Sequence, residues 1–211
     1  MADRTATTRT RNRRGEGARL RDEIVAAAVE LLDETGDEGA ITLRSVARRA
    51  GIAAPSIYRH FPDQPAIMLA VVRQAFAELT ALLRDEVAAA GDDPRRRLFA
   101  GCHAYLRYAE EHPQRYRLMF GGLWMPSLND TSVTRDDVAT LGDACIELLT
   151  GTLDGCVTAG LATSADLHTD TIALWLGLHG LAHQRASTVA FPWPPDIADH
   201  IITTLAHLRD A

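Results

Sequence analysis

The 211-residue sequence contains no lysine, so all 22 of its basic side chains are arginines. A functional requirement for arginine would not apply at every surface position. We therefore attribute the absence of lysine to a GC-rich genome. Cysteine is scarce as well: Cys102, Cys145 and Cys156 are an odd number, lie far apart in apolar surroundings and lack metal-type spacing. A disulfide framework is therefore not expected, which suits a reducing cytoplasm.

Long apolar runs and enzyme motifs are also missing. The longest stretch without a charged residue, 171–184, is too short to span a bilayer, and the Arg- and Thr-rich N-terminus has no apolar signal segment. No Gly-rich phosphate loop or Gly-x-Ser-x-Gly elbow occurs, and the adjacent Cys102 and His103 would point about 100° apart on a helix. We expect a soluble cytoplasmic protein with no membrane contact, no catalytic activity and no cofactor.

The net charge is positive only towards the N-terminal end of the chain. Residues 1–60 hold eleven arginines against nine acids, which gives a charge of +2. The remaining residues have a charge of −8, so the whole chain has a net charge of −6. Within residues 1–21, seven arginines oppose two acids. An electropositive end on an acidic body indicates a localised DNA contact, whereas a non-specific architectural protein would need more positive charge overall.

Residues 42–61 read as two short helices joined by a tight turn. Thr42 can cap a first helix that extends to about residue 50, and Gly51 can adopt the left-handed conformation of the turn. The second helix begins near Pro55, which suits a first helical position, and ends before Pro62. Such a unit can place its outward side chains in the major groove of DNA.

The same residues resemble the helix-turn-helix of the TetR family of bacterial one-component regulators. The resemblance rests on Thr42, the Ala47, Ala50, Gly51 and Ile52 core, Pro55-Ser56-Ile57-Tyr58, and His60-Phe61. It implies an all-α homodimer of about nine helices per chain, with an N-terminal three-helix DNA-binding domain and a C-terminal helical bundle. The chain departs from the family pattern at Gln64, where a lysine usually holds a phosphate.

Within this interpretation we predict two kinds of DNA contact. Base edges or groove walls are assigned to Arg44, Ala54, Ser56 and Arg59, and phosphates to Thr42, Tyr58 and His60, with Pro55 at the start of the second helix. The partner is a palindromic double-stranded DNA operator, because a dimer with a two-fold axis matches such a site.

We divide the chain into a disordered Arg-rich arm (1–17), a helix-turn-helix DNA-binding domain (18–62) and a ligand-binding and dimerisation domain (63–211). Helical periodicity predicts helices at 18–35, 64–90, 94–111, 113–120, 134–159, 165–187 and 195–209. Residues 171–184 are apolar nearly all round and need cover on both sides. With Gly177 and Gly180 allowing close approach, the last two helices are expected to form an intersubunit four-helix bundle.

Aromatic and sulfur-containing side chains concentrate in the C-terminal body. They can line a pocket for a small apolar or aromatic effector that releases the operator, which would make the protein a repressor, although core packing explains any single one of them. The candidate ligand-binding set is Phe76, Cys102, His103, Tyr105, Tyr116, Phe120, Trp124, Cys145, Trp175 and His179.

Two alternatives stay open at this point. His179 and His183 stand four residues apart, a genuine ligand spacing for a metal-sensing regulator, although no partnering cysteine or carboxylate follows in the sequence. The favoured interpretation includes no metal site. The output could also be activation rather than repression, because no residue in the sequence decides between them.

Overall fold

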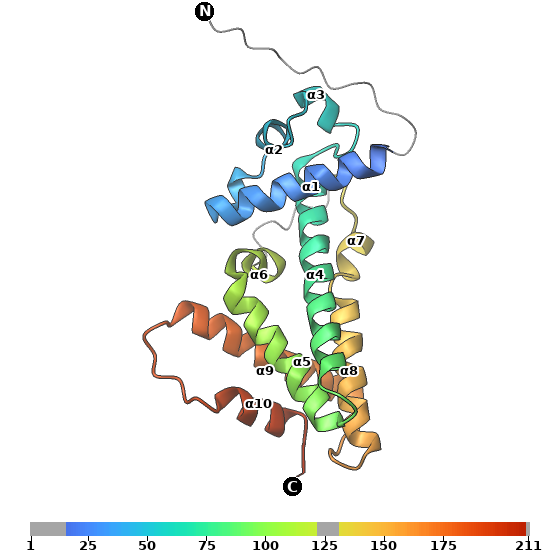
Figure 1. The fold of residues 1–211 in the computed structure, drawn as a ribbon, viewed down its shortest axis with the longest axis vertical. Coiled ribbons are helices and arrows are strands. Elements are labelled where there is room, and N and C mark those ends of the chain that lie inside the picture. The colour runs from blue at the N-terminus through green and yellow to red at the C-terminus, as the bar shows by residue number, and fades with distance from the viewer. Residues whose placement is uncertain (1–15, 122–130, 210–211) are drawn as a thin grey trace, which may run out of the picture.

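The structure, a computed structural model, describes residues 16–121 and 131–209. Those residues contain ten α-helices, one 3₁₀ helix and no β-strand, so the predicted all-α class is confirmed (Figure 1). In chain order the helices are α1 (Glu16–Thr35), η1 (Glu38–Ala40), α2 (Leu43–Arg49), α3 (Ala54–Ile57), α4 (Gln64–Ala89), α5 (Pro94–Glu111), α6 (Pro113–Phe120), α7 (Arg135–Ala139), α8 (Asp143–Thr158), α9 (Leu167–Ser187) and α10 (Ile197–Leu205).

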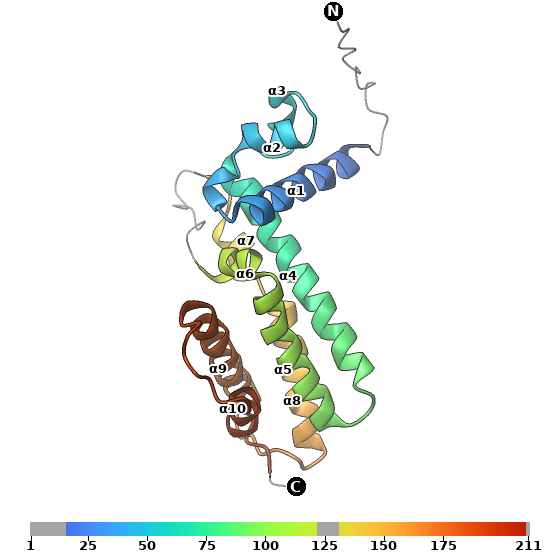
Figure 2. The same cartoon turned by 60° about the vertical axis from the view of Figure 1, so that its left-hand side comes forward.

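Two hydrophobic cores lie at opposite ends of an elongated molecule, and α4 runs between them (Figures 1 and 2). The first core joins α1, α2 and α3 to the start of α4, and it also takes in Leu118 of α6 and Val133. The second joins α5, α8, α9 and α10 to the rest of α4. Residues after the boundary predicted at residue 62, from α4 and α6, therefore belong to the same core as the helix-turn-helix. The domain boundaries stay a prediction.

Helix α4 is the structural link between the two cores. The side chain of Asp63 accepts a hydrogen bond from the backbone N–H of Ala66 at 2.9 Å and so caps its first turn, as the sequence predicts. Among the described residues this is the one helix long and apolar enough to span a membrane, yet 56% of its most apolar window is buried inside the protein. Its apolar character is that of a shared core helix.

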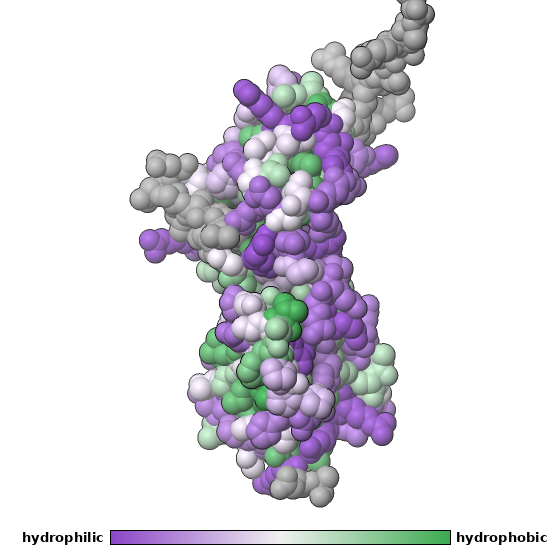
Figure 3. All heavy atoms as spheres, turned by 90° about the vertical axis from the view of Figure 1, so that its left-hand side faces the viewer, coloured by the Kyte–Doolittle hydropathy of each residue, from purple (hydrophilic) through white to green (hydrophobic). Residues whose placement is uncertain are grey.

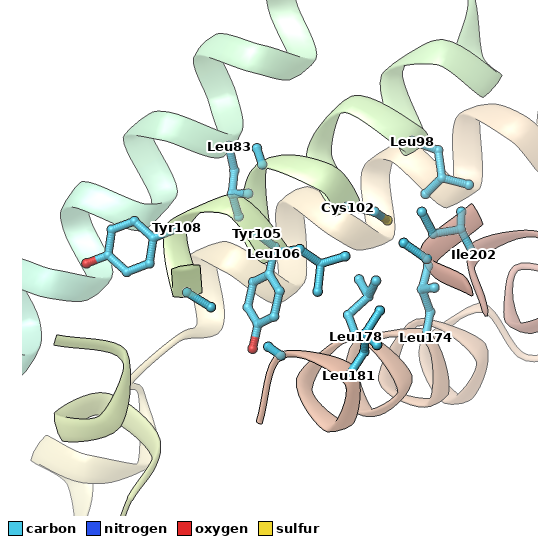
Figure 4. Close-up of a cluster of buried hydrophobic side chains, with 14 of the residues drawn as sticks. Leu83, Leu98, Cys102, Tyr105, Leu106, Tyr108, Leu174, Leu178, Leu181 and Ile202 are labelled. Atoms are coloured by element: carbon cyan, nitrogen blue, oxygen red, sulfur yellow. The ribbon is translucent and has the colours of Figure 1, made fainter. Parts of the chain in front are cut away.

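The second core is built around α5, whose two tyrosines are directed towards different neighbouring helices (Figure 4). Tyr108 is directed towards α4, where its hydroxyl donates to the carbonyl oxygen of Ala75 at 3.2 Å. Tyr105 is directed towards α9 (Figure 4), and both side chains are almost fully buried. The direction of Tyr105 places a polar group between α5 and α9, where the candidate effector site is formed.

The single helix predicted at 134–159 is wrong: two helices, α7 and α8, occupy this segment. They are separated at Gly142, whose φ of +87° is a left-handed conformation that other residues rarely adopt. A side chain at this position would also meet Phe76, since an added Cβ would lie 3.0 Å from its ring. The apolar periodicity continues through the break, so the pattern alone could not locate it.

Helix α9 is covered on one side within the chain. Leu174, Leu178 and Leu181 are buried against the second core, while Leu176 on the other side is 53% exposed. Gly177 permits the close approach of α10, because an added Cβ would lie 2.4 Å from Leu205 Cδ1. Gly177 therefore serves packing within one chain.

Replacement of Gly177 by alanine is expected to lower the free energy of unfolding by about 1–3 kcal/mol, because the new methyl group overpacks the α9–α10 contact. The matched control is Gly151→Ala in α8, where an added Cβ meets nothing within 4 Å. That variant should gain about 1 kcal/mol or less from helix propensity. Urea unfolding at one protein concentration compares the two, and equal effects would contradict the packing role.

Candidate functional site

Local interactions fix the start of α2 and the turn between α2 and α3. Thr42 Oγ1 accepts from the backbone N–H of Ser45 at 3.1 Å, and Ser45 Oγ accepts from that of Thr42 at 2.9 Å, which forms a reciprocal cap. Gly51 has the expected left-handed conformation, with φ of +65°. The second helix is shorter than predicted and ends at Ile57, after which the N–H groups of Arg59 and His60 donate to carbonyl oxygens three residues earlier, in a tighter turn.

The outward surface of this unit carries the predicted DNA-binding residues. Thr42, Arg44, Ala54, Pro55, Tyr58 and Arg59 are exposed, and Ser56 and His60 are half-buried. The apolar pair Ile57 and Phe61 is buried, as predicted. Because the α2–α3 unit stands at the far end of the molecule from α10 (Figure 1), this surface is free to meet a large partner. Contact with DNA stays a prediction for each of these residues.

Charge on the α2–α3 surface is not neutralised by the rest of the described chain. Arg44, Arg48 and Arg59 are exposed and form no ion pair with a described residue. Arg49, by contrast, pairs with Glu34 of α1 and is not available. Sequence reasoning omitted Arg48, although its position four residues after Arg44 on one helix could have indicated it.

Gln64, the position at which the family usually has a lysine, has an internal role. Its Nε2 donates to the carbonyl oxygen of Ile41 at 2.9 Å. The side chain thereby ties the start of α4 to the connection before α2. The glutamine helps to fix the orientation of the α2–α3 unit on α4. It does not supply the positive charge with which a lysine would bind a phosphate.

In the body, three polar side chains from three helices meet among aromatic rings. His179 Nδ1 lies 2.6 Å from the hydroxyl of Tyr116 and 3.2 Å from that of Tyr105, and the two hydroxyls are 2.9 Å apart. These contacts are all satisfied when Tyr116 donates to Nδ1 and Tyr105 donates to the oxygen of Tyr116, an arrangement in which the ring proton of His179 is on Nε2. We call these residues the Tyr–Tyr–His triad.

The surroundings of the triad keep all three groups neutral at pH 7. Burial lowers the pKa of His179, and the nearby His183 lowers it further. Burial also raises the pKa of Tyr116 to about 12 and raises the pKa of Tyr105 well above its usual value. Neutral groups can exchange hydrogen bonds with a ligand without first losing a charge.

Aromatic rings enclose the triad. Phe120 lies 4.8 Å from both Tyr116 and His179 between ring centroids, and Trp175 stacks on His179 at 5.5 Å. Phe76 reaches this group through an edge contact with Phe120 at 5.6 Å. The structure thus brings six of the predicted ligand-binding residues together, from α4, α5, α6 and α9.

Two spaces adjoin this group. A small interior cavity of about 30 Å³ lies among α4, α5, α8 and α9, and Cys102, Cys145, Tyr105 and Trp175 are among its lining residues. A cleft of about 610 Å³ lies between α6 and the second half of α9. It is lined by Ala109, Pro113, Gln114, Tyr116, Arg117, Phe120, Gly121, His179, Gly180, Ala182, His183, Gln184, Ala186 and Ser187, and we call it the α6–α9 cleft.

Of the other predicted ligand-binding residues, Cys102 and Cys145 line the interior cavity beside the cluster, and His103 lies away from it. His103 lies on another face of α5, where its Nε2 is 2.8 Å from a carboxylate oxygen of Asp199 and its side chain is 46% exposed. Trp124 falls outside the described residues. Adjacent residues on a helix diverge, so Cys102 faces the interior cavity while His103 faces solvent.

The metal-sensing alternative receives no third ligand from the described residues. No group of three or more His, Cys, Asp or Glu that could hold a metal ion is found among them. His179 Nδ1 already accepts a hydrogen bond from Tyr116, and His183 is exposed. The two histidines share a helix face, as their spacing predicts, and among the described residues no further donor joins them.

Helix α6 connects the cluster to the DNA-binding end. Arg115 donates to both carboxylate oxygens of Asp33 on α1, at 3.1 and 2.6 Å, and to Glu78 on α4 at 2.5 Å. Arg117 donates to the carbonyl oxygen of Gly36, the residue that follows α1. With Leu118 buried in the first core, the helix that supplies Tyr116 is also fixed to α1.

Comparison with known families gives matches over both ends of the chain. Residues 24–71 match the family described as bacterial regulatory proteins, tetR family. Residues 98–208, more than half of the chain, match the family described as tetracyclin repressor-like, C-terminal domain. The two matches include the α2–α3 unit and the Tyr–Tyr–His triad respectively.

Individual relatives are similar over part of their length. The chain is 31% identical over 112 residues to the HTH-type transcriptional activator FasR of Mycolicibacterium smegmatis, which covers 52% of this chain and 50% of that protein. It is 32% identical over 80 residues to the HTH-type transcriptional regulator BetI of Stenotrophomonas maltophilia, covering 38% and 40%. The chain thus spans about half the length, or less, of these curated relatives.

Solved structures are similar over almost the whole fold. A Rhodococcus sp. RHA1 protein of unknown function superposes with a TM-score of 0.70 and 26% identity, covering 89% of this chain and 91% of that one. A TetR family transcription regulator from Marinobacter aquaeolei VT8 superposes with a TM-score of 0.63 and 16% identity, covering 92% and 97%. At that identity the second likeness concerns the fold alone.

The lowered pKa of His179 predicts a pH-dependent stability. The folded protein binds fewer protons at this site than the unfolded chain, so this contribution is present above pH 6.5 and is lost as the pH falls below it. A His179→Asn variant keeps an acceptor for Tyr116 but does not titrate. The difference in urea midpoint between wild type and variant should therefore shrink from about pH 7 to about pH 5, whereas parallel pH profiles would contradict the assignment.

Proposed function

Because this chain belongs to the TetR family of bacterial regulators, we propose that it is a transcriptional repressor whose homodimer leaves a palindromic operator when a small effector binds the body. Members of the family are DNA-binding transcriptional regulators rather than enzymes. The observation that carries the proposal is the α2–α3 surface, on which exposed arginines without a described ion-pair partner surround a helix-turn-helix. The cytoplasm, where the DNA is, is its proposed location.

The roles on DNA follow from exposure and chemistry. Arg44 and Arg59 can each offer two donors to a guanine edge, and the short side chain of Ser56 permits close approach to the groove. Tyr58 and His60 stand where a hydroxyl and a ring N–H can donate to phosphate oxygens. Arg48, on the same helix as Arg44, adds a further phosphate contact in this arrangement.

Dimerisation is assigned to the outer side of α9 and α10. Figure 3 shows hydrophobic residues among polar ones over this part of the surface. Three large apolar side chains are well exposed: Leu176 on α9, and Val189 and Phe191 in the segment between α9 and α10. A soluble chain gains by covering such a patch. Two copies joined through α9 and α10 would present their α2–α3 units to half-sites spaced by about 34 Å or a multiple of it.

Release of the operator is assigned to α6. An effector beside the Tyr–Tyr–His triad contacts Tyr116 and Phe120, which belong to the helix that Arg115 and Arg117 hold against α1 and its end. A shift of α6 therefore alters the position of α1 and with it the α2–α3 unit. A coupling of about 1–3 kcal/mol is the usual size of such an effect. FasR, one relative, is named an activator, so activation of transcription is the alternative output.

The function is tested by selecting bound duplexes from a random DNA pool with the purified protein near physiological salt. We expect enrichment of an inverted repeat, and Tyr58→Ala should bind the selected duplex at least tenfold more weakly, because a donor to phosphate is lost. Tyr58 is 54% exposed, so the variant should keep the wild-type unfolding midpoint and dimer mass. Arg97→Ala, an exposed change on α5, is the control. A folded protein that enriches no motif would reject the proposal.

The coupling role of α6 is tested by Arg115→Ala, which removes the contacts to Asp33 and Glu78. We expect operator affinity without effector to fall about fivefold or more, because the α1 position is no longer fixed. The matched control is Arg107→Ala, which breaks a 2.6 Å ion pair with Glu86 inside the body and should change affinity less than about twofold. Equal losses in the two variants would show that α6 has no special role.

A further inference from the structure

The α6–α9 cleft has the size and walls of a site for a flat ligand. Its volume of about 610 Å³ lies within the usual range of small-molecule sites, whereas the interior cavity has room for about one water molecule. Tyr116, Phe120 and His179 line the cleft with ring centroids 4.8 to 5.6 Å apart. Such walls favour stacking or edge contacts with an aromatic ring.

The charge of the cleft is opposite to that of the body. No aspartate or glutamate is among the described residues that line it, although the whole chain carries a net charge of −6. Arg117 lines it and forms no ion pair with a described residue, whereas Arg115 and Arg185 nearby are both paired with carboxylates. Arg117 is therefore available to bind an anionic group of a ligand in the cleft.

A second polar group in the cleft also lacks a partner. Gln114 lines the cleft and its amide lies against Gly36. Its Oε1 is buried and accepts no hydrogen bond from the described residues. Buried polar atoms are nearly always paired, so an unpaired one beside a cleft indicates a site completed by another molecule.

We propose that the effector is an aromatic carboxylate that binds in the α6–α9 cleft, with its rings against Tyr116, Phe120 and His179 and its carboxylate on Arg117. This rests on the proposed function, since it names the effector class of that regulator. Arg117 now donates to the uncharged carbonyl oxygen of Gly36. A carboxylate is the stronger acceptor, so the ligand draws Arg117 from Gly36 and removes one of the contacts that hold α6 to the end of α1.

The test measures binding of 2-naphthoate to the full chain by calorimetry near physiological salt, with uncharged 2-naphthalenemethanol as its isostere. Naphthoate should bind about tenfold or more tightly than the alcohol, because the hydrogen bond to Arg117 is charge-assisted. Arg117→Gln should remove that advantage without weakening the alcohol, while Arg97→Gln on exposed α5 should change neither. The glutamine removes the charge but keeps a polar side chain, and the unfolding midpoint checks that the variant is folded.

Three results would overturn the inference: equal affinity for naphthoate and alcohol in the wild type, undiminished naphthoate affinity in Arg117→Gln, or no saturable binding of either ring. The first comparison needs no variant. Naphthoate is then added to the complex with the selected duplex, where release of DNA is expected and retention would reject the effector role. Calorimetry uses no DNA, so failure to select an operator rejects the proposed function separately, while failed binding with an intact operator complex rejects this inference alone.

Discussion

Two buried tyrosines and a half-buried histidine that hydrogen-bond to one another constrain the arrangement of α5, α6 and α9. Tyr105, Tyr116 and His179 come from these three helices, and each has its hydrogen-bonding partner in another. Separating them without replacement leaves buried donors or an acceptor unpaired, at about 1–3 kcal/mol each. The position of α6 is therefore fixed from the side of the body, and through Arg115 and Leu118 the position of α1 depends on it.

Local sequence signals predicted the elements that depend on neighbours in the chain. The cap at Thr42, the left-handed Gly51 and the cap at Asp63 all follow from residue type and spacing, and each has the predicted geometry. Buried Ile57 and Phe61, four residues apart, likewise show the periodicity of one helix face. The break at Gly142 escaped prediction because the apolar periodicity of α7 and α8 continues through it.

The sequence predicted which residue types form the candidate site, but not how they are arranged in space. Tyr105, Tyr116 and His179 were in the predicted set because of their residue types, but their mutual hydrogen bonds depend on the packing of three helices. The same list included His103, which faces solvent, since a list of residue types does not say on which side of a helix each one lies. Arg117 was absent from it, because an unpaired charge is recognised only when all possible partners have been located.

The first core has a consequence for how such regulators could be recombined. Leu118 and Val133 are buried among residues of α1, α2 and α4, although they come from far beyond the helix-turn-helix in the sequence. An engineer who grafts residues 16–62 onto another regulator's body would leave these two side chains behind and open a gap in the transplanted core. A functional hybrid must include these two residues or have side chains of equal volume from the new body. In this fold, the segment that has to be transferred is therefore larger than the part that contacts DNA.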